Sequence, residues 1–158
     1  MLLERKTKPR SRLILHDKMI LRTDRLILRP LKDSDAQSVA ENANNLNVSK
    51  WLLKMPYPYR LKDALEWIRR NKEKLQKRPV EEYSFGIEVK SEHKVVGGIS
   101  LVHIDRYGGN AEVGYWLGER YRGQRRQLWI LLLIVLNYAG LKRVFSMEIL
   151  HLGDCLKN

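Results

Sequence analysis

The sequence predicts a single domain of the mixed α/β class, and three observations lead to this fold. The expected elements follow one another in the order β-α-α-β-β-β-α-β. Three consecutive strand patterns separated by short polar turns are typical of an antiparallel meander. A closing β-α-β step adds one parallel strand, so the sheet is mixed and carries helices on its faces.

The first strand is expected at residues 24–31, which alternate in part and run into Pro30. Asp33 and Ser34 are N-cap residue types and predict a first helix, which ends in an Asn-rich segment. A second helix is indicated by apolar residues at positions i, i+4, i+7 and i+14. These residues are Leu61, Leu65, Ile68 and Leu75. The tetrapeptide RLIL at 25–28 also occurs at 12–15, where it offers an extra strand beside the first.

Three further strands are expected at 83–89, 94–104 and 111–119. Gly97 and Gly98, inside the second of these, predict a bulge or a close approach of two backbones. Residues 127–138 form a helix that is apolar nearly all round, so it is expected to be buried. Gly140 is its expected C-cap, and a last strand follows at 143–150.

The chain has 158 residues and a formal net charge of +12, a balance that suits a polyanionic partner or a phosphate-bearing ligand. A generally basic surface without a special partner explains the charge equally well. Cys155 is the single cysteine, so neither an internal disulfide nor a metal cluster is expected. The longest apolar run, 128–136, is far shorter than the roughly 20 residues of a membrane span. We therefore expect a cytoplasmic protein with a basic extension at 1–20 and one domain at 21–158.

Several separate motifs carry a family resemblance. They are LRTDRLILRPLKDSDA, WLLKMPYPY, DALEWI, SFGIEVK, KVVGGISL and AEVGYWLGERYRGQ, in this order. Together they span about residues 21–124 and resemble the GNAT N-acetyltransferases, most closely the RimJ/RimL type that acts on ribosomal-protein N-termini. The resemblance implies the GNAT acyl-CoA N-acyltransferase fold, acetyl-CoA as co-substrate, no metal, and transfer of the acetyl group to an amine.

The family's pyrophosphate loop follows its fourth strand with the pattern Arg/Gln-x-x-Gly-x-Gly/Ala. In this chain the pattern maps onto 120–125, with Gly123 as the first glycine and Arg125 where Gly or Ala is expected. Backbone N–H groups at the start of a helix bind phosphate there. The implied cofactor-binding residues are Trp116, Leu117, Arg120, Arg122, Gly123, Gln124 and Arg125, with Arg126 beside them.

Beyond Gln124 the match to the family is broken, and the usual C-terminal elements, which supply a CoA contact and often a Tyr general acid, are lacking. A frame slip near that codon and true divergence both explain this. By resemblance, Glu112 is the general base, acting directly or through water, and N–H groups near Trp116 and Leu117 polarise the carbonyl at a strand bulge. Trp51, Tyr57 and Tyr59 are expected to line the acceptor side.

Each of these assignments has an ordinary alternative. Glu112 also fits a solvent-facing strand residue, and the aromatic residues also fit simple packing of a Pro-rich loop. His103 is expected to be structural or exposed rather than a proton carrier.

Two other interpretations of the whole chain stay open. One is an inactive relic or basic protein that binds RNA or acidic partners through its charge. The other is a homodimer formed by pairing of the last strand with a second copy.

Overall fold

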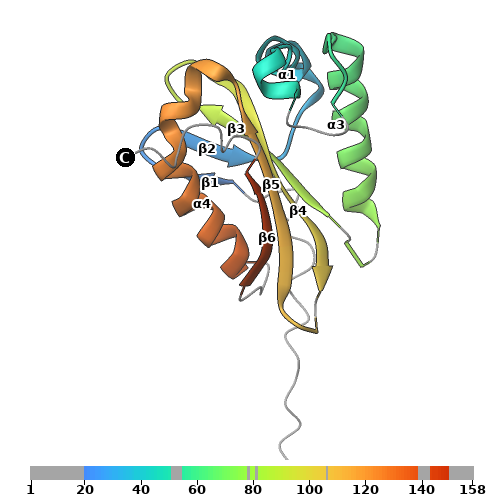
Figure 1. Cartoon of the computed structure of the whole chain (residues 1–158), viewed down its shortest axis with the longest axis vertical. Helices are drawn as coiled ribbons and strands as arrows, with labels where there is room; N and C mark the ends of the chain where they lie inside the picture. The colour runs from blue at the N-terminus through green and yellow to red at the C-terminus, as the bar shows by residue number, and fades with distance from the viewer. Residues whose placement is uncertain are drawn as a thin grey trace, which may run out of the picture.

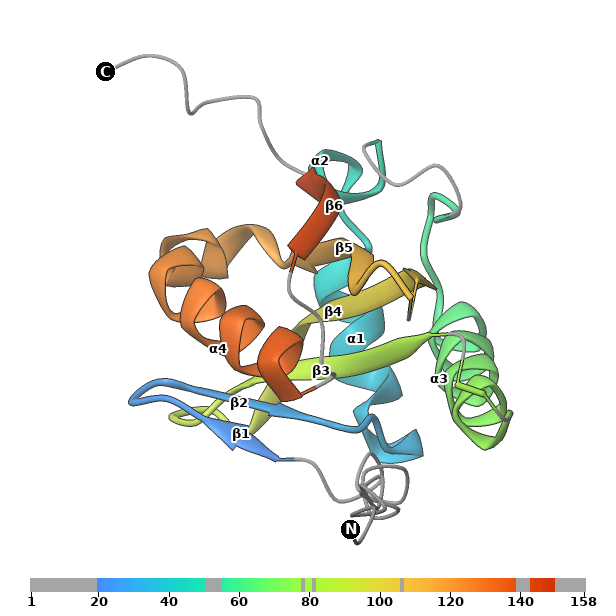
Figure 2. The same ribbon diagram turned by 90° about the horizontal axis from the view of Figure 1, so that it is seen from below.

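The computed structural model describes residues 20–50, 55–77, 79–80, 82–105, 107–138 and 143–149. For residues 124, 125, 138 and 143–149 it describes the backbone alone. In these residues one twisted sheet separates α1 and α3 on one face from α4 on the other (Figures 1 and 2). The predicted mixed α/β class is confirmed.

The sheet has six strands in the order β1-β2-β3-β4-β5-β6, which is also their order in the sequence. Neighbours are antiparallel except for β5 and β6, which are parallel. The bounds are β1 Leu21–Arg22, β2 Leu26–Arg29, β3 Tyr83–Val89, β4 Lys94–Asp105, β5 Asn110–Leu117 and β6 Arg143–Ile149.

The helices cross between the strands or cover the sheet. Their bounds are η2 Asp33–Asp35, α1 Ala36–Ala43, α2 Leu46–Ser49, α3 Leu61–Gln76, η3 Glu119–Gln124 and α4 Arg125–Tyr138, where η marks a 3₁₀ turn. The crossover from β5 to the parallel β6 is made by η3 and α4. It therefore places the start of α4 directly after the end of β5.

Two apolar cores form because alternate residues of each strand point to opposite faces. On β5, Val113 and Leu117 belong to the core beneath α4, whereas Trp116 belongs to the core beneath α1 and α3. Trp116 packs edge-on against Trp67 of α3, with ring centroids 6.2 Å apart. A Cβ at Gly97 would lie 2.3 Å from the Trp116 carbonyl oxygen, so the predicted close backbone approach at Gly97 is confirmed.

A buried ion cluster lies at the start of the first helix, and neither Asp33 nor Ser34 is its N-cap residue. Asp35 is the N-cap residue of α1, but its side chain makes no cap hydrogen bond. Its carboxylate instead accepts from both terminal nitrogens of Arg29, each at 2.8 Å, and from the Lys32 N–H at 2.7 Å. Arg29 also pairs with Glu88 of β3, so one guanidinium joins β2, η2 and β3.

The burial of α3 and of α4 differs from the prediction. In α3 the buried residues are Ala64, Ile68 and Asn71, whereas Leu61 and Leu65 are exposed. The helix was predicted correctly, but its buried face is turned by about one residue, since Trp67 packs over the sheet at Gly98.

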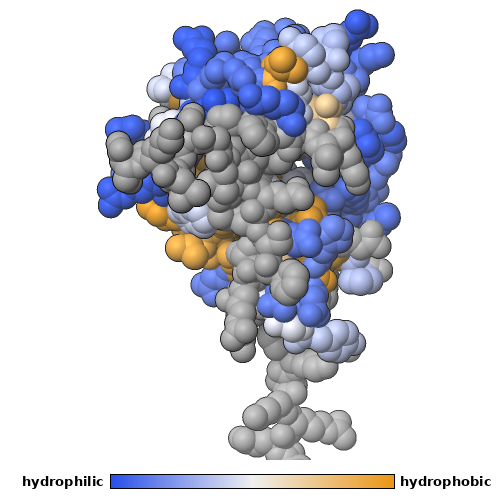
Figure 3. Space-filling view, in the orientation of Figure 1, coloured by the Kyte–Doolittle hydropathy of each residue, from blue (hydrophilic) through white to orange (hydrophobic). Residues whose placement is uncertain are grey.

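Helix α4 is buried on one side only. Its outer face exposes large apolar side chains, and orange atoms mark this area in Figure 3. They are Trp129, Ile130, Leu133 and Ile134. The prediction of full burial was wrong, because the sheet covers a single face of this helix.

On the side away from β3, β2 pairs with the two-residue β1, with Leu21 opposite Leu28. The alternative at residues 12–15 lies outside the described residues, as does the predicted C-cap Gly140.

Candidate functional site

The segment expected to bind pyrophosphate begins at the end of β5. Gly118 donates its N–H to the Val96 carbonyl at 2.8 Å, and its own carbonyl accepts from the Tyr121 N–H at 2.9 Å. The chain then turns through η3 into the fourteen-residue α4. In proteins, backbone N–H groups at the start of a helix commonly bind phosphate, and this turn stands at that place.

The two glycines of this segment have different surroundings. A Cβ at Gly118 would lie 2.4 Å from the Asn42 Oδ1 atom of α1, so Gly118 is needed for packing. Around Gly123, no heavy atom of the described structure would come within 4 Å of a Cβ, apart from those of its chain neighbours and of the nearby backbone of its own helix. The backbone of Gly123 is therefore open on that side, which is what a phosphate group needs for close approach.

Positive charge surrounds this open backbone. Arg120 and Arg126 are exposed, and Arg122 is about one quarter exposed. Guanidinium groups form strong, charge-assisted hydrogen bonds with phosphate oxygens. For Gln124 and Arg125 only the backbone is described, at the junction of η3 and α4. The donor set and the open glycine together fit a pyrophosphate group.

Two contacts fix this segment to the sheet. The hydroxyl of Tyr121 donates to Glu92, in the turn between β3 and β4, at 2.8 Å, and this hydrogen bond raises the pKa of Tyr121. The Gln127 Oε1 atom of α4 accepts from the Thr23 hydroxyl at 2.7 Å and from the Arg25 N–H at 3.1 Å. The start of α4 is thereby held against the hairpin of β1 and β2.

The backbone of β5 offers one donor beside this segment. Opposite residues of an antiparallel pair alternate between hydrogen-bonded and non-hydrogen-bonded. Because Gly118 bonds to Val96, the next pair, Leu117 with Gly97, is non-hydrogen-bonded. The N–H of Leu117 therefore points away from β4, toward the side of β6. The N–H of Trp116 points the opposite way, toward β4, and its side chain is buried in the core.

Glu112 lies on β5 with its side chain on the face of α1 and α3, as Trp116 does. Its Oε2 atom lies 2.7 Å from the His103 Nδ1 atom. His103 has a positive φ of 48°, and the pairing of β4 with β5 shifts register between Val102 and Asp105. This bulge turns the exposed imidazole toward Glu112, an arrangement that the sequence pattern did not predict.

Glu112 is separated from the Leu117 donor by five residues of extended strand, or about 16 Å. Between them, β5 pairs with β6 as far as Tyr115 opposite Ile149, and the register shift of this pairing falls between Ala111 and Glu112. This irregularity lies beside the expected base. On the side of β4, the pairing of Trp116 and Leu117 is regular. One carbonyl group cannot contact Leu117 and also lie within reach of Glu112.

The residues expected on the acceptor side differ in exposure. Tyr57 is exposed, whereas Tyr59 is buried in the core beneath α1 and α3. Burial, aided by the charge of Asp63, raises the pKa of Tyr59 to about 12. Trp51 lies outside the described residues. Beside Glu112, a Cβ at Gly114 would meet no heavy atom within 4 Å in the described structure, chain neighbours excepted, so there is room next to the carboxylate.

The described part of the chain shows neither a metal site nor a membrane span. No group of three or more His, Cys, Asp or Glu residues is placed to hold a metal ion there. Among the helices described, none combines the length and the apolar character of a membrane span.

Sequence reasoning missed the residues that position the loop. Asn45 caps α2 through its Oδ1 atom, a role that its residue type signals. Its second contact, with Glu119, links residues 74 apart in the sequence. The contacts of Tyr121 and Gln127 are also long-range, and no local pattern indicates such pairs.

A sheet with a parallel β5-α4-β6 step and an open glycine at the helix start defines the class of this protein, an N-acyltransferase of the GNAT fold. A model of the acetyltransferase (GNAT) domain matches residues 25–145. The chain therefore belongs to the GNAT acetyltransferase family. No curated protein matches it by sequence.

Solved structures share the fold at low sequence identity. A putative ribosomal-protein-serine acetyltransferase from Vibrio cholerae superposes with a TM-score of 0.69 at 20% identity, covering 82% of this chain and 74% of that one. RimL, a ribosomal L7/L12 α-N-protein acetyltransferase solved with coenzyme A, gives 0.64 at 19% identity, with 81% and 73% covered. The microcin C7 self-immunity acetyltransferase MccE, in complex with acetyl-CoA and AMP, gives 0.62 at 20%, with 78% and 69% covered.

Proposed function

We propose that this chain transfers an acetyl group from acetyl-CoA to an amine, and that the acceptor is a protein N-terminal α-amine of the ribosomal-protein type. The observation that carries the proposal is the open backbone at Gly123, surrounded by arginines at the start of α4. Family membership supports the reaction class, and the names of two structural neighbours support the acceptor.

In this proposal the pyrophosphate of acetyl-CoA binds the first N–H groups of α4 together with Arg120 and Arg122. The extended pantetheine arm then runs along β5 and pairs with the N–H of Leu117. The thioester lies further along β5, toward Glu112. The described pairing of β6 with β5 runs from Asn110 to Tyr115 and does not include Leu117.

The chemical step is a direct attack without a covalent enzyme intermediate. The amine nitrogen bonds to the thioester carbonyl carbon, the carbon–sulfur bond breaks, and CoA leaves as the thiolate. The amine proton passes to Glu112, directly or through water. His103 holds the Oε2 atom of Glu112 at 2.7 Å, which leaves Oε1 for the acceptor. Tyr57, which is exposed, is assigned to the acceptor side in this proposal.

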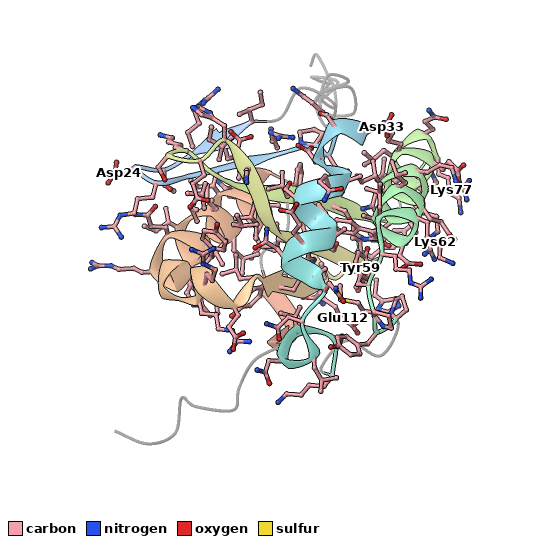
Figure 4. The ribbon with its side chains drawn as sticks, turned by 90° about the horizontal axis from the view of Figure 1, so that it is seen from above. Asp24, Asp33, Tyr59, Lys62, Lys77 and Glu112 are labelled. Carbon is pink, nitrogen blue, oxygen red and sulfur yellow. The ribbon has the colours of Figure 1, made fainter. Side chains whose placement is uncertain are left out.

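Calorimetric titration with acetyl-CoA tests the binding part of the proposal. Micromolar affinity, about −8 kcal/mol, is expected for the native chain. Gly123→Ala should fold normally but bind at least about tenfold more weakly, because its methyl group occupies the open side. Arg122→Ala should also bind more weakly. Lys62→Ala is the matched control, since Lys62 points away from the sheet on the outer side of α3 (Figure 4).

Arg125→Gly restores the glycine that the family pattern has at this position. Binding by this variant but not by the native chain would assign the loss to the Arg125 side chain. If neither chain binds acetyl-CoA, the proposed function is wrong.

The catalytic part is tested with N-terminal peptides as acceptors. Glu112→Gln should lower kcat by about 10²-fold or more and leave the affinity for acetyl-CoA unchanged. A Glu112→Gln variant of native activity would show that another group, or the amine itself without a base, completes the reaction.

A further inference from the structure

One carboxylate beside the proposed phosphate site is held by a segment distant in sequence. Glu119, the first residue of η3, accepts from the Asn45 side-chain amide at 2.6 Å through Oε2. It accepts from the Asn47 side-chain amide at 3.2 Å through Oε1. Both asparagines belong to α2 or its cap, between α1 and α3. We call Asn45, Asn47 and Glu119 the Glu119 clasp.

The orientation of both amides is fixed by other contacts. The Asn45 Oδ1 atom accepts from the Asn47 N–H at 2.8 Å, and the Asn47 Oδ1 atom accepts from the Lys50 ammonium at 3.0 Å. Each amide therefore presents its NH₂ group to residue 119. Two facing donors require a side chain with two acceptor atoms, and an ionised carboxylate is such a side chain.

Arg122 lies between this clasp and the proposed phosphate site. It donates to the Asn47 carbonyl at 3.5 Å and lies 4.0 Å from Glu119, so both contacts are at the outer limit of their kind. Its remaining donors are available to a phosphate. When Arg122 turns to a phosphate, the hydrogen bonds of Asn45 and Asn47 still hold Glu119 in place.

Building on the proposed function, we propose that Glu119 is a positioning residue that joins α2, on the acceptor side, to the phosphate-binding segment. Binding of acetyl-CoA immobilises η3, and the hydrogen bonds of the Glu119 clasp then reduce the motion of α2 as well. Acetyl-CoA thereby orders the acceptor side before the amine binds.

A purely structural role of the Glu119 clasp and the proposed coupling predict different effects of a substitution at Glu119. Glu119→Gln removes a negative charge near a site for an anion, so acetyl-CoA should bind as well or slightly better. The glutamine NH₂ group faces one asparagine NH₂ group, however, so one hydrogen bond of the clasp is lost. The variant should therefore combine native or tighter acetyl-CoA binding with a raised KM for the acceptor and little change in kcat.

Tyr121→Phe is the matched control. It removes another side-chain anchor of η3, the hydrogen bond to Glu92, without touching α2. If the loss of any side-chain contact of η3 affected α2, Glu119→Gln and Tyr121→Phe would give the same result. Coupling through the clasp predicts that only Glu119→Gln affects α2.

Hydrogen exchange read by mass spectrometry, with and without acetyl-CoA, measures the coupling without relying on activity. In the native chain and in Tyr121→Phe, acetyl-CoA should slow exchange at residues 46–50 by about tenfold, the factor expected of one charge-assisted hydrogen bond. In Glu119→Gln this slowing should vanish while acetyl-CoA still binds.

Equal slowing in Glu119→Gln and the native chain would overturn the inference and leave the proposed function intact. Acetyl-CoA binding to the native chain without any slowing at 46–50 would do the same. Absence of acetyl-CoA binding in calorimetry would overturn the proposed function, and this inference with it.

Discussion

Loss of the Arg29 side chain should destabilise the fold strongly. Its guanidinium is buried between Asp35 and Glu88, each about one tenth exposed, and it joins three elements. Replacing it with methionine leaves two buried carboxylates without their cation. Arg29→Met should lower the free energy of unfolding by about 3–5 kcal/mol in urea denaturation.

Arg29→Lys is the control for this prediction. It keeps the charge but cannot make the paired hydrogen bonds to Asp35, so its loss of stability should be smaller. If the methionine variant were as stable as the native chain, hydrophobic packing would be shown to replace the cluster fully.

Asp35 should make stability depend on acid pH. Burial raises the pKa of its carboxyl, but the hydrogen bonds from Arg29 and from the Lys32 N–H outweigh burial and hold the pKa below its usual value. The unfolded chain then binds the proton more readily than the folded chain. This stabilisation is complete above the unfolded-state pKa of about 3.9 and is lost as pH falls through the lower folded-state value.

Urea denaturation across the acid range measures this dependence. Asp35→Asn should show a shallower loss of stability below about pH 4 than the native chain. Parallel curves for the two proteins would mean that other carboxyl groups cause the acid sensitivity.

Among the elements, α4 has two apolar faces in different surroundings. Leu131 is fully buried against the sheet, while Leu133 is 64% exposed on the outer face. Leu131→Ala should destabilise the protein by about 2–5 kcal/mol, the usual range for a buried leucine. Leu133→Ala removes the same atoms from the same helix and should change stability by less than about 0.5 kcal/mol.

Urea denaturation of both α4 variants makes the comparison. A large loss for Leu133→Ala would show that the outer face is covered in solution, by a second copy or by another part of the chain. Light scattering at several protein concentrations would then tell these two cases apart.

The meander of β3, β4 and β5 and the parallel step to β6 were predictable from the sequence, because these strands follow one another in the chain and alternation and turn residues are local signals. The two-residue β1 was not predicted. The buried face of α3 was not predictable from leucine spacing. Trp67 over Gly98 decides how that helix sits, and this contact joins two elements. The prediction that α4 is fully buried was wrong for a related reason. Apolar composition does not show how many faces of a helix pack against other elements.

The candidate site shows the same limit. Gly123 and its arginines follow from a local pattern, and the structure places them together. The links from Glu119 to Asn45 and from Glu112 to His103 depend on pairing across the fold. The second also needs the bulge at His103, where a non-glycine residue has a positive φ. The residue types alone do not indicate either of these two contacts.

For the whole molecule, the net charge of +12 predicts that an anionic ligand binds in a salt-dependent way. Raising the ionic strength from about 0.1 M to about 1 M shortens the screening length from about 10 Å to about 3 Å. The affinity for acetyl-CoA should fall over this range. Arg122→Ala should flatten the dependence, whereas Lys62→Ala should leave its slope nearly unchanged, as calorimetry at each salt concentration will show.

If the affinity for acetyl-CoA depended on salt equally in the native chain and in Arg122→Ala, the electrostatic field of the whole protein, and not the arginines of η3, would attract the ligand. A salt-dependent affinity for RNA in a chain that ignores acetyl-CoA would instead favour the basic binding protein.

The contact of Gln127 with Thr23 joins two segments that lie 104 residues apart in the sequence and are therefore synthesised at different times. The strands from β1 to β5 can pair in the order of synthesis, each with the one before it. The apolar face beneath α4 stays open to water until the last third of the protein has emerged. During that interval the nascent chain exposes Leu26, Leu28 and Phe85, so chaperone binding should be strongest just before α4 leaves the exit tunnel.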